Sequence, residues 1–139
     1  MNHIALEVDD IDEALAFWES IFGPLTLRGR GRQMAFVDMG DQFLALARGR
    51  TQPADQHRHF GLVVDDKEAV RARLKELRIP VSSGRGLDFR DPSGNLIQVV
   101  DYRDVQFTKT DNMLAAMNLD DLEKSESARE ELRARGISV

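Results

Sequence analysis

The chain repeats one of its own segments, and this internal repeat limits the folds it can adopt. Residues 3–10 read HIALEVDD and residues 59–66 read HFGLVVDD, so a His, a Leu, a Val and two Asp recur at matched places. A helical pattern and strand-like runs follow each copy, and the run at 43–46 corresponds to the run at 96–99. A unit of about 50 residues is too small to bury a good core alone. We therefore expect two similar units that share a sheet surface.

The stretch from residue 86 to residue 102 is typical of a strand, a tight turn and a second strand. Residues 87–90 alternate apolar and polar side chains, which is the period of a half-buried strand. Residues 91–94 read DPSG, in which the proline presets φ and the glycine tolerates a positive φ. The following run, residues 96–100, has one polar interruption, Gln98. Because the turn fixes the register, Gln98 is predicted to lie on one defined face.

Four helices are predicted. Residues 10–22 and residues 66–77 carry apolar side chains at helical spacing after each repeated segment. Beyond the repeat, residues 112–117 and 125–135 indicate two short helices, and Ser127 begins a capping-box pattern in the second. The interpretation of this tail stays open between a lid, a dimer clasp and a partly mobile segment.

Composition excludes several classes of function. With 139 residues the chain has the size of one domain. A net charge of −5 argues against a general nucleic-acid surface. The absence of cysteine excludes disulfides, thiolate metal sites and Cys nucleophiles. No apolar run approaches the roughly 20 residues of a membrane span, and no leader is visible before the first strand, so we expect a cytoplasmic protein without membrane partners.

Four stretches carry a resemblance to a known family. They are HIALEV at 3–8, ALAFW leading to FG at 14–23, HFGLVV at 59–64 and FRDPSGN at 89–95. In these the chain resembles the vicinal oxygen chelate superfamily, which includes glyoxalase I, fosfomycin- and bleomycin-resistance proteins and extradiol dioxygenases.

The resemblance implies an α+β fold in which two tandem βαβββ modules form curved mixed sheets around a cleft. It covers residues 1–102, which are expected to be a single domain with module one at 1–50 and module two at 57–102. Residues 103–139 are expected to form a helical C-terminal extension. A homodimer and a small-molecule ligand are the corresponding expectations for partners.

The resemblance also places His3, His59 and Gln98 at three of the four metal-ligand positions of the family. Imidazole suits Zn, Ni, Mn and Fe, and an open position would let the metal act as a Lewis acid. The sequence departs from the family at two places, because Ala45 and Gln98 stand where glyoxalases have Glu. A neutral amide loses the charge attraction of a carboxylate and is not a usable base. Glu7, on the same strand face as His3, is another carboxylate that could contribute.

The candidates for ligand binding are Arg32, Phe89 and Arg90. Arg32 belongs to the basic stretch RGRGR at 28–32, for which a solvated loop and an anion-recognition lip are the two interpretations. The loop at 82–86 is expected beside the cleft mouth, in reach of a ligand.

Three functions fit these observations. The first is a divalent-metal-dependent lyase or resistance-type transferase that uses His3, His59 and Gln98. The second is a metal-free protein of the bleomycin-resistance kind that binds and sequesters a small antibiotic-type molecule. The third is a degenerate module with an interaction or regulatory role. Metal retention after purification separates the first function from the others, because inference from fold to function is association.

Overall fold

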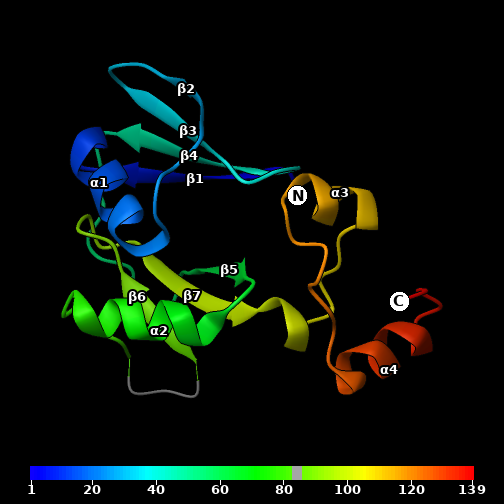
Figure 1. The fold of residues 1–139 in the computed structure, drawn as a ribbon. Coiled ribbons are helices and arrows are strands. Elements are labelled where there is room, and N and C mark those ends of the chain that lie inside the picture. Colours follow the sequence, from blue (N-terminus) through cyan, green and yellow to red (C-terminus); the bar gives the residue numbers. More distant parts are fainter. Residues whose placement is uncertain (83–85) are drawn as a thin grey trace.

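The computed structural model describes residues 1–82 and 86–139, and of the predicted ligand loop residues 83–85 lie outside the described residues. The first module forms a mixed sheet in the order β1-β4-β3-β2, in which β1 runs parallel to β4 (Figure 1). Its strands are β1 (His3–Val8), β2 (Leu27–Arg30), β3 (Met34–Asp38) and β4 (Phe43–Arg48).

The second module repeats this arrangement with three strands among the residues that the structure describes. Its sheet has the order β5-β7-β6, and β5 runs parallel to β7 as β1 does to β4. The strands are β5 (Phe60–Val64), β6 (Leu87–Arg90) and β7 (Leu96–Asp101). The strand expected near residue 80 is only an isolated bridge between Val81 and Phe89. Pro80 has no backbone N–H to donate to a ladder, which disfavours pairing before Val81.

Both modules start their helix in the same way, as the repeat predicts. Helix α1 (Ile11–Phe22) begins after Asp10, whose side chain accepts a hydrogen bond from the Glu13 N–H at 3.0 Å. Helix α2 (Lys67–Glu76) begins after Asp66, which accepts from the Ala69 N–H at 2.9 Å. Each aspartate satisfies an orphan N–H and suits the helix dipole.

One hydrophobic core joins the two modules, and α1 is shared between them. The Trp18 ring lies 6.4 Å from the Phe60 ring of β5, and the Phe17 ring lies 6.0 Å from the Phe89 ring of β6. Leu6 and Leu46 of the first sheet and the side chains of the second sheet that alternate with Gln98 belong to the same cluster. Each sheet therefore turns one face to this core and leaves its other face free for a site.

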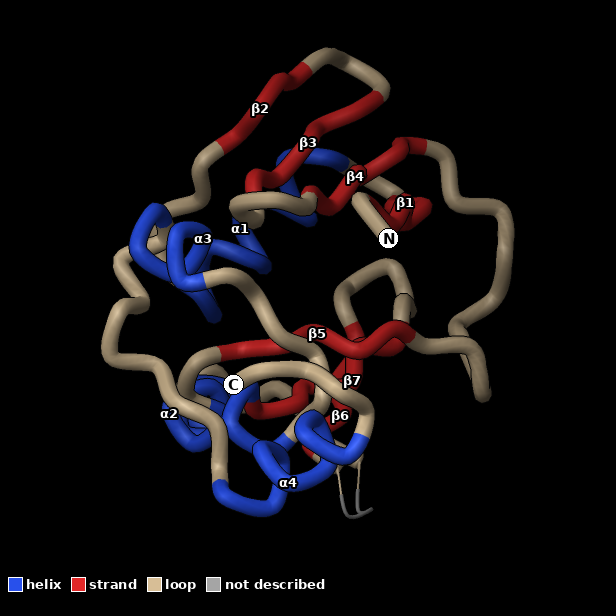
Figure 2. Tube along the Cα trace, turned by 90° about the vertical axis from the view of Figure 1, so that its right-hand side faces the viewer, coloured by secondary structure: helices blue, strands red, loops and turns tan. Residues whose placement is uncertain are grey.

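The C-terminal tail runs along both sheets. It contains a 3-10 turn η1 (Tyr102–Asp104) and the helices α3 (Asp111–Ala116) and α4 (Glu126–Ala134). Figures 1 and 2 show α3 beside the first sheet and α4 beside the second. The cap of α4 is Ser125 rather than the predicted Ser127, because the Ser125 hydroxyl accepts from the Ala128 N–H at 3.3 Å. Within the described ranges, no helix has the length and apolar character that crossing a membrane requires.

Candidate functional site

On the open face of the first sheet, His3 packs on the ring of Phe43, which contacts Phe36, and we call these two phenylalanine rings the aromatic shelf. The pleat of β1 places His3, Ala5 and Glu7 on the side opposite Leu6 and Val8, which are buried. The His3 ring stacks on Phe43 of β4, with 4.6 Å between ring centroids, and Phe36 of β3 packs edge-on against Phe43.

Ala45 lies in the middle of this face and offers no donor atom. The register pairs Ala5 with Ala45 and Ala45 with Phe36, so the three form one row across the sheet. Ala45 is 2% exposed. The first module therefore supplies one imidazole to the predicted metal site and no carboxylate at this position.

The open face of the second sheet carries Gln98 and, at the start of β5, His59. Gln98 pairs with Gly61 of β5, and His59 comes two residues before Gly61, just before the strand begins at Phe60. If the alternation of β5 continues back by one residue, His59 is expected on the face of Gln98. Gly61 has open space above its Cα, so no side chain separates them there.

Two of the three predicted metal ligands, His59 and Gln98, belong to the second module, and the third, His3, belongs to the first sheet. Among the described residues, no hydrogen bond or ring contact joins His3 to His59 or Gln98. His3 lines a cavity of about 500 Å³ between the edges of β1 and β5, which the tail covers, and neither His59 nor Gln98 lines it. Within residues 1–82 and 86–139 no three His, Cys, Asp or Glu side chains cluster closely enough to hold a metal ion.

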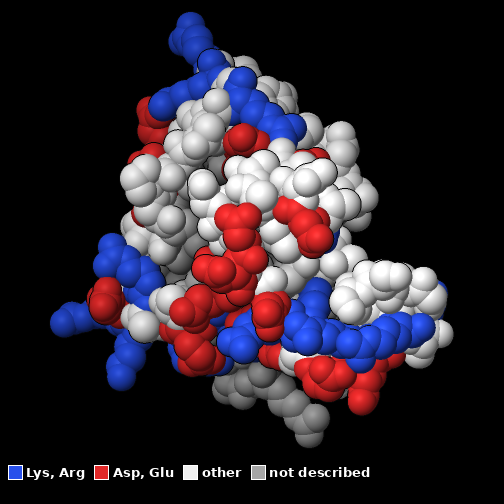
Figure 3. Space-filling model, turned by 45° about the vertical axis from the view of Figure 1, so that its right-hand side comes forward, with Lys and Arg blue, Asp and Glu red and all other residues white. Residues whose placement is uncertain are grey.

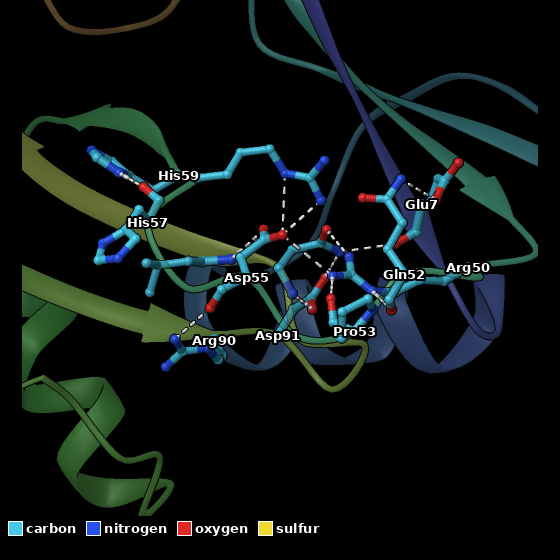
Figure 4. Close-up of polar contacts among 12 residues, drawn as sticks. Glu7, Arg50, Gln52, Pro53, Asp55, His57, His59, Arg90 and Asp91 are labelled. Carbon is cyan, nitrogen blue, oxygen red and sulfur yellow. Dashed lines mark hydrogen bonds and ion pairs between the residues drawn. The ribbon is translucent and has the colours of Figure 1, made fainter.

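Both histidines are oriented in the same way by an oxygen atom. The Nδ1 atom of His3 lies 2.7 Å from Asn2 Oδ1. The Nδ1 atom of His59 lies 2.8 Å from the carbonyl oxygen of His57, as Figure 4 shows. An oxygen of this kind accepts a hydrogen bond, so Nδ1 of each ring is the donor and Nε2 is the nitrogen that these contacts leave unused. Metal-binding histidines are held by such contacts to the nitrogen that does not bind the metal.

The predicted ligand-binding residues take other roles in the structure. Phe89 is 1% exposed and belongs to the core, so its burial does not support direct contact with a ligand. The neighbouring side chain on the open face is that of Asp88, because the strand alternates. Arg90 is exposed and donates from Nη2 to the carbonyl oxygen of Asp55 at 2.6 Å. No described residue forms a hydrogen bond or ion pair with Arg32, which is exposed.

The arginines of the stretch at 28–32, together with Arg48, Arg50 and Arg58, form a basic cluster in the sequence that the structure divides into three parts. Arg30, Arg32 and Arg48 line a hollow of about 430 Å³ with the first residues of α1, and Arg30 pairs with Asp12 there. Figure 3 shows the basic side chains at the top of this view, over the β2–β3 hairpin. Arg30 pairs across the sheet with Ala35, a core residue, so the hollow lies on the helix side and not on the face of His3.

Arg28 alone of this cluster reaches the face of His3, where its guanidinium lies 5.2 Å from the centre of the Phe43 ring. Arg28 also donates to Asp38 at 2.9 Å and to two backbone carbonyls, so it holds the aromatic shelf in place.

The third part of the cluster is a buried polar network that the sequence analysis missed. Arg50, with 3% of its side chain exposed, donates to the carbonyl oxygen of Pro53 at 2.6 Å and contacts Asp55 at 3.4 Å (Figure 4). Arg58 donates to the same Asp55 oxygen at 2.7 Å, and the Leu96 N–H donates to the other at 3.2 Å. The linker between the modules is therefore fixed against β7 and supports the start of β5, where His59 lies.

The turn at residues 91–95 completes this network. The Asn95 side chain donates to Asp91 Oδ2 at 2.7 Å and to the carbonyl oxygen of Glu7 at 3.0 Å. Burial raises the pKa of the Asp91 carboxyl, and the hydrogen bonds from Asn95 offset only part of this effect. Gly94 has a φ of +89°, and a Cβ there would lie 2.9 Å from Ala54, so the turn requires glycine. The DPSGN motif thus joins the two modules and sets the register of Gln98.

Comparison with known proteins places this architecture in one family. The model of the Glyoxalase/Bleomycin resistance protein/Dioxygenase superfamily matches residues 1–99. The chain belongs to this superfamily. It is 29% identical over 97 residues to the metallothiol transferase FosB of Lysinibacillus sphaericus, covering 66% of this chain and 68% of the relative.

Solved structures of the superfamily have the same fold. The crystal structure of lactoylglutathione lyase from Agrobacterium tumefaciens matches with a TM-score of 0.60 and 29% identity, over 73% of this chain and 92% of the other. A possible glyoxalase from Bacillus cereus matches with a TM-score of 0.60 and 28% identity, over 72% and 96%. The match to the superfamily model ends at residue 99, so α3 and α4 lie beyond it.

Proposed function

We propose that this member of the glyoxalase superfamily is a divalent-metal-dependent enzyme that acts on a small molecule. The proposal rests on one observation: His3 and His59 are held in the same way, each by a contact between its Nδ1 atom and an oxygen atom. His3 and His59 occupy equivalent places in the two repeats, and an oxygen atom holds Nδ1 of each. Both therefore offer Nε2 on an open sheet face, which is the arrangement that metal ligation needs.

The donor set agrees with a transition metal. Two imidazole nitrogens and the amide oxygen of Gln98 suit Zn, Ni, Mn or Fe better than they suit Mg or Ca. A divalent ion in this position supplies a Lewis acid for an oxygen atom of the substrate. The Phe43 ring under His3 gives the first sheet an apolar floor on which the carbon skeleton of a small substrate can lie.

Group transfer is the reaction class that we favour over isomerisation. The two curated relatives that match first are both named metallothiol transferase FosB. An isomerisation of the glyoxalase type needs a base that carries a proton between two atoms, and the neutral amide of Gln98 cannot accept one. Transfer of a thiol to a small electrophile instead requires a metal that acts as a Lewis acid and a site that orients the two substrates.

The complete site is proposed to form between two copies of the chain. His3 lies on the first sheet, whereas His59 and Gln98 belong to the second module, and the described part of one chain has no hydrogen bond or ring contact that joins them. In a dimer with a two-fold axis, the open face of one subunit's first sheet can meet the open face of the partner's second sheet, and this occurs twice. Such a dimer has two equivalent sites.

Elemental analysis of the untagged protein tests the proposal. We expect a stoichiometric transition metal that is lost in His59→Ala and retained in His57→Ala. His57 is the matched control because it is exposed and its backbone oxygen, which orients His59, remains after the substitution. The metal-loaded protein should then add a low-molecular-weight thiol to fosfomycin. Failure of the wild-type protein to bind Zn, Ni, Mn or Fe(II) would overturn the proposal.

A metal-free binding protein is the second candidate, because one observation favours it. Ala45 and Gln98 leave both glutamate positions of the family without a carboxylate, and the His3–Phe43–Phe36 shelf suits stacking of an aromatic ligand. This candidate predicts ligand binding that a chelator does not change. The metal-dependent enzyme predicts that the chelator abolishes activity.

A further inference from the structure

The hydrophobic core continues into a cavity between the two modules. The cavity has a volume of about 500 Å³ and lies beside β1 and β5, each of which is an edge strand of its sheet. The two sheets line it with side chains that belong to the core or pack against it, namely Ile4, Leu44, Phe60, Leu62 and Val64. At its rim the cavity reaches His3 and Phe43. It is therefore an interior, mainly apolar space that the repeated modules leave unfilled.

The C-terminal tail forms the cover of this cavity. Figure 1 shows the tail passing from the end of β7 to α3, beside the first sheet, before it returns to α4. The tail contributes a second set of mainly apolar side chains to the lining, namely Tyr102, Phe107, Leu114, Met117, Leu119 and Leu122. All of them lie beyond residue 99, where the match to the superfamily model ends.

Contacts at both ends hold the tail over the cavity. Lys109 pairs with Asp41 in the turn between β3 and β4. Met117 packs against the same turn, where a Cβ on Gly40 would lie 2.8 Å from its Sδ atom. At the other end, Lys124 donates to three backbone carbonyls near the start of the tail. The tail is thus fixed where it crosses the cavity, and it spans the space rather than filling it.

The volume of the cavity fits a small organic ligand. Pockets that bind such ligands have volumes of about 300–1,000 Å³ and mostly apolar linings. An apolar space without an occupant leaves its lining short of dispersion contacts, in contrast to the close packing of protein interiors. Apolar cavities stay dry and take up apolar molecules. A ligand in this cavity would restore the missing contacts.

The charged side chains of the lining already have their own partners or face solvent. Lys109 pairs with Asp41, and Asp65 is exposed and accepts a hydrogen bond from the Asp66 N–H at 3.0 Å. Among the described residues, no lining side chain has a buried polar atom without a partner. A ligand here has no buried charge to neutralise.

We propose that this cavity is a binding site for an uncharged, apolar organic molecule of about one or two aromatic rings, which the C-terminal tail encloses. Neither His59 nor Gln98 lines the cavity. Binding there is therefore independent of the metal function proposed above.

Fluorescence titration of the full-length, metal-stripped protein with N-phenyl-1-naphthylamine tests the proposal, because this uncharged probe brightens in an apolar environment. We expect saturable binding of one molecule per chain, unchanged by a chelator. Leu122→Trp puts a larger ring into the cavity and should weaken binding by at least about tenfold. Ile137→Trp is the matched control, since Ile137 belongs to the same tail but does not line the cavity, and it should bind as the wild type does.

Thermal unfolding of the same proteins provides a second readout. The probe should raise the Tm of the wild type and of Ile137→Trp, and raise that of Leu122→Trp much less. Leu119→Phe is a milder filling variant for the case that Leu122→Trp does not fold, and it should also weaken binding. Wild-type affinity in the folded filling variants would place the probe elsewhere on the protein and overturn the proposal. Absence of saturable binding by the wild type would overturn it too, whereas the metal content of the protein bears only on the function proposed above.

Discussion

Arg50 donates a hydrogen bond from Nη1 to Oδ1 of Asn95, and this contact joins residues that lie 45 positions apart in the sequence. Arg50 belongs to the linker after β4, and Asn95 belongs to the turn before β7. Asn95 in turn contacts the backbone of Glu7 in β1. One side chain therefore connects the linker, the second module and the first module in the buried region next to the start of β5.

Replacement of Arg50 should destabilise the whole domain. Arg50→Met keeps the volume of the side chain and leaves Asp55 without one of its cations in a buried place. Removal of one partner from a buried ion pair costs about 3–5 kcal/mol, so we expect the free energy of unfolding to fall by about this amount in urea denaturation.

The matched control is Arg71→Met, which breaks the exposed pair between Arg71 and Glu68 on α2. Exposed pairs contribute about 0–1 kcal/mol, so this variant should unfold almost as the wild type does. Equal effects of the two substitutions would contradict the importance assigned to the buried network.

The Asp55 carboxylate should make the protein sensitive to acid. Burial alone would raise the pKa of Asp55, but hydrogen bonds from Arg58 and from the Leu96 N–H, together with the charges of Arg58 and Arg50, hold it below the ordinary value of 3.8. Between 3.8 and the folded-state value the unfolded chain binds more protons. The contribution of Asp55 to stability is therefore present above pH 3.8 and is lost as the pH falls further.

Asp55→Asn tests this acid dependence, because it removes the titrating group at the same position. We expect the free energy of unfolding to change less steeply with pH below about pH 4 in the variant than in the wild type. Asp91 contributes with the opposite sign, since its raised pKa makes the folded state hold a proton more tightly and lose stability as the pH rises. An unchanged slope in Asp55→Asn would assign the acid sensitivity to other carboxylates.

The repeat and the DPSGN turn allowed most of the fold to be predicted from the sequence. The period of two in residues 87–90 predicts which side chains enter the core, and the turn places Gln98 on the face of His59. The same alternation assigns Asp88 to that face, so Phe89 as a ligand contact conflicted with a pattern visible in the sequence. The position of Asp88 beside Gln98 needed the pairing of β6 with β7.

The buried network could not be predicted in the same way. Residues 50–58 read RTQPADQHR, which has the composition of a solvated linker. Arg50 also follows a series of other arginines, and composition does not distinguish the one whose guanidinium is buried from those that line an exposed hollow. Burial of Arg50 depends on the carbonyl oxygen of Pro53 and on Asn95, which come together only when the modules pack. Contacts between residues so far apart in the sequence leave no recognisable pattern in the local amino-acid sequence.

Lys124 should control how firmly the tail is attached. It is 8% exposed, its Nζ donates to the carbonyl oxygens of Tyr102, Val105 and Phe107, and it lies 3.4 Å from the centre of the Tyr102 ring. Hydrogen bonds to a charged group contribute about 1.5–3 kcal/mol. Lys124→Met should therefore speed amide hydrogen exchange in α3 and α4 by about tenfold or more, with little change in the sheets.

Lys75→Met on the exposed side of α2 is the control for this measurement, and it should leave exchange in the tail unchanged. Tail amides that exchange at the wild-type rate in Lys124→Met would show that α4 is held by its apolar face, through Ala128 and Leu132, rather than by the lysine.

Mixed dimers should separate a site shared between subunits from a site within one chain. His3→Ala and His59→Ala should each abolish metal binding when prepared alone. If the two variants are unfolded together and refolded, about half of the dimers contain one chain of each kind under random pairing. In such a dimer one site has lost both histidines, while the other combines the wild-type His3 of one chain with the wild-type His59 of its partner.

We therefore expect the mixture to recover about a quarter of the wild-type metal content, since half of the dimers have one intact site of two. A mixture of His59→Ala with Gln98→Ala is the matched control, because both residues belong to the second module of one chain and every mixed dimer then has a defect in each site. Recovery in the first mixture and not in the second would place His3 opposite His59 and Gln98 across the subunit boundary. No recovery in either would require His3 and His59 to bind the metal within one chain, after a movement of the first sheet toward the second.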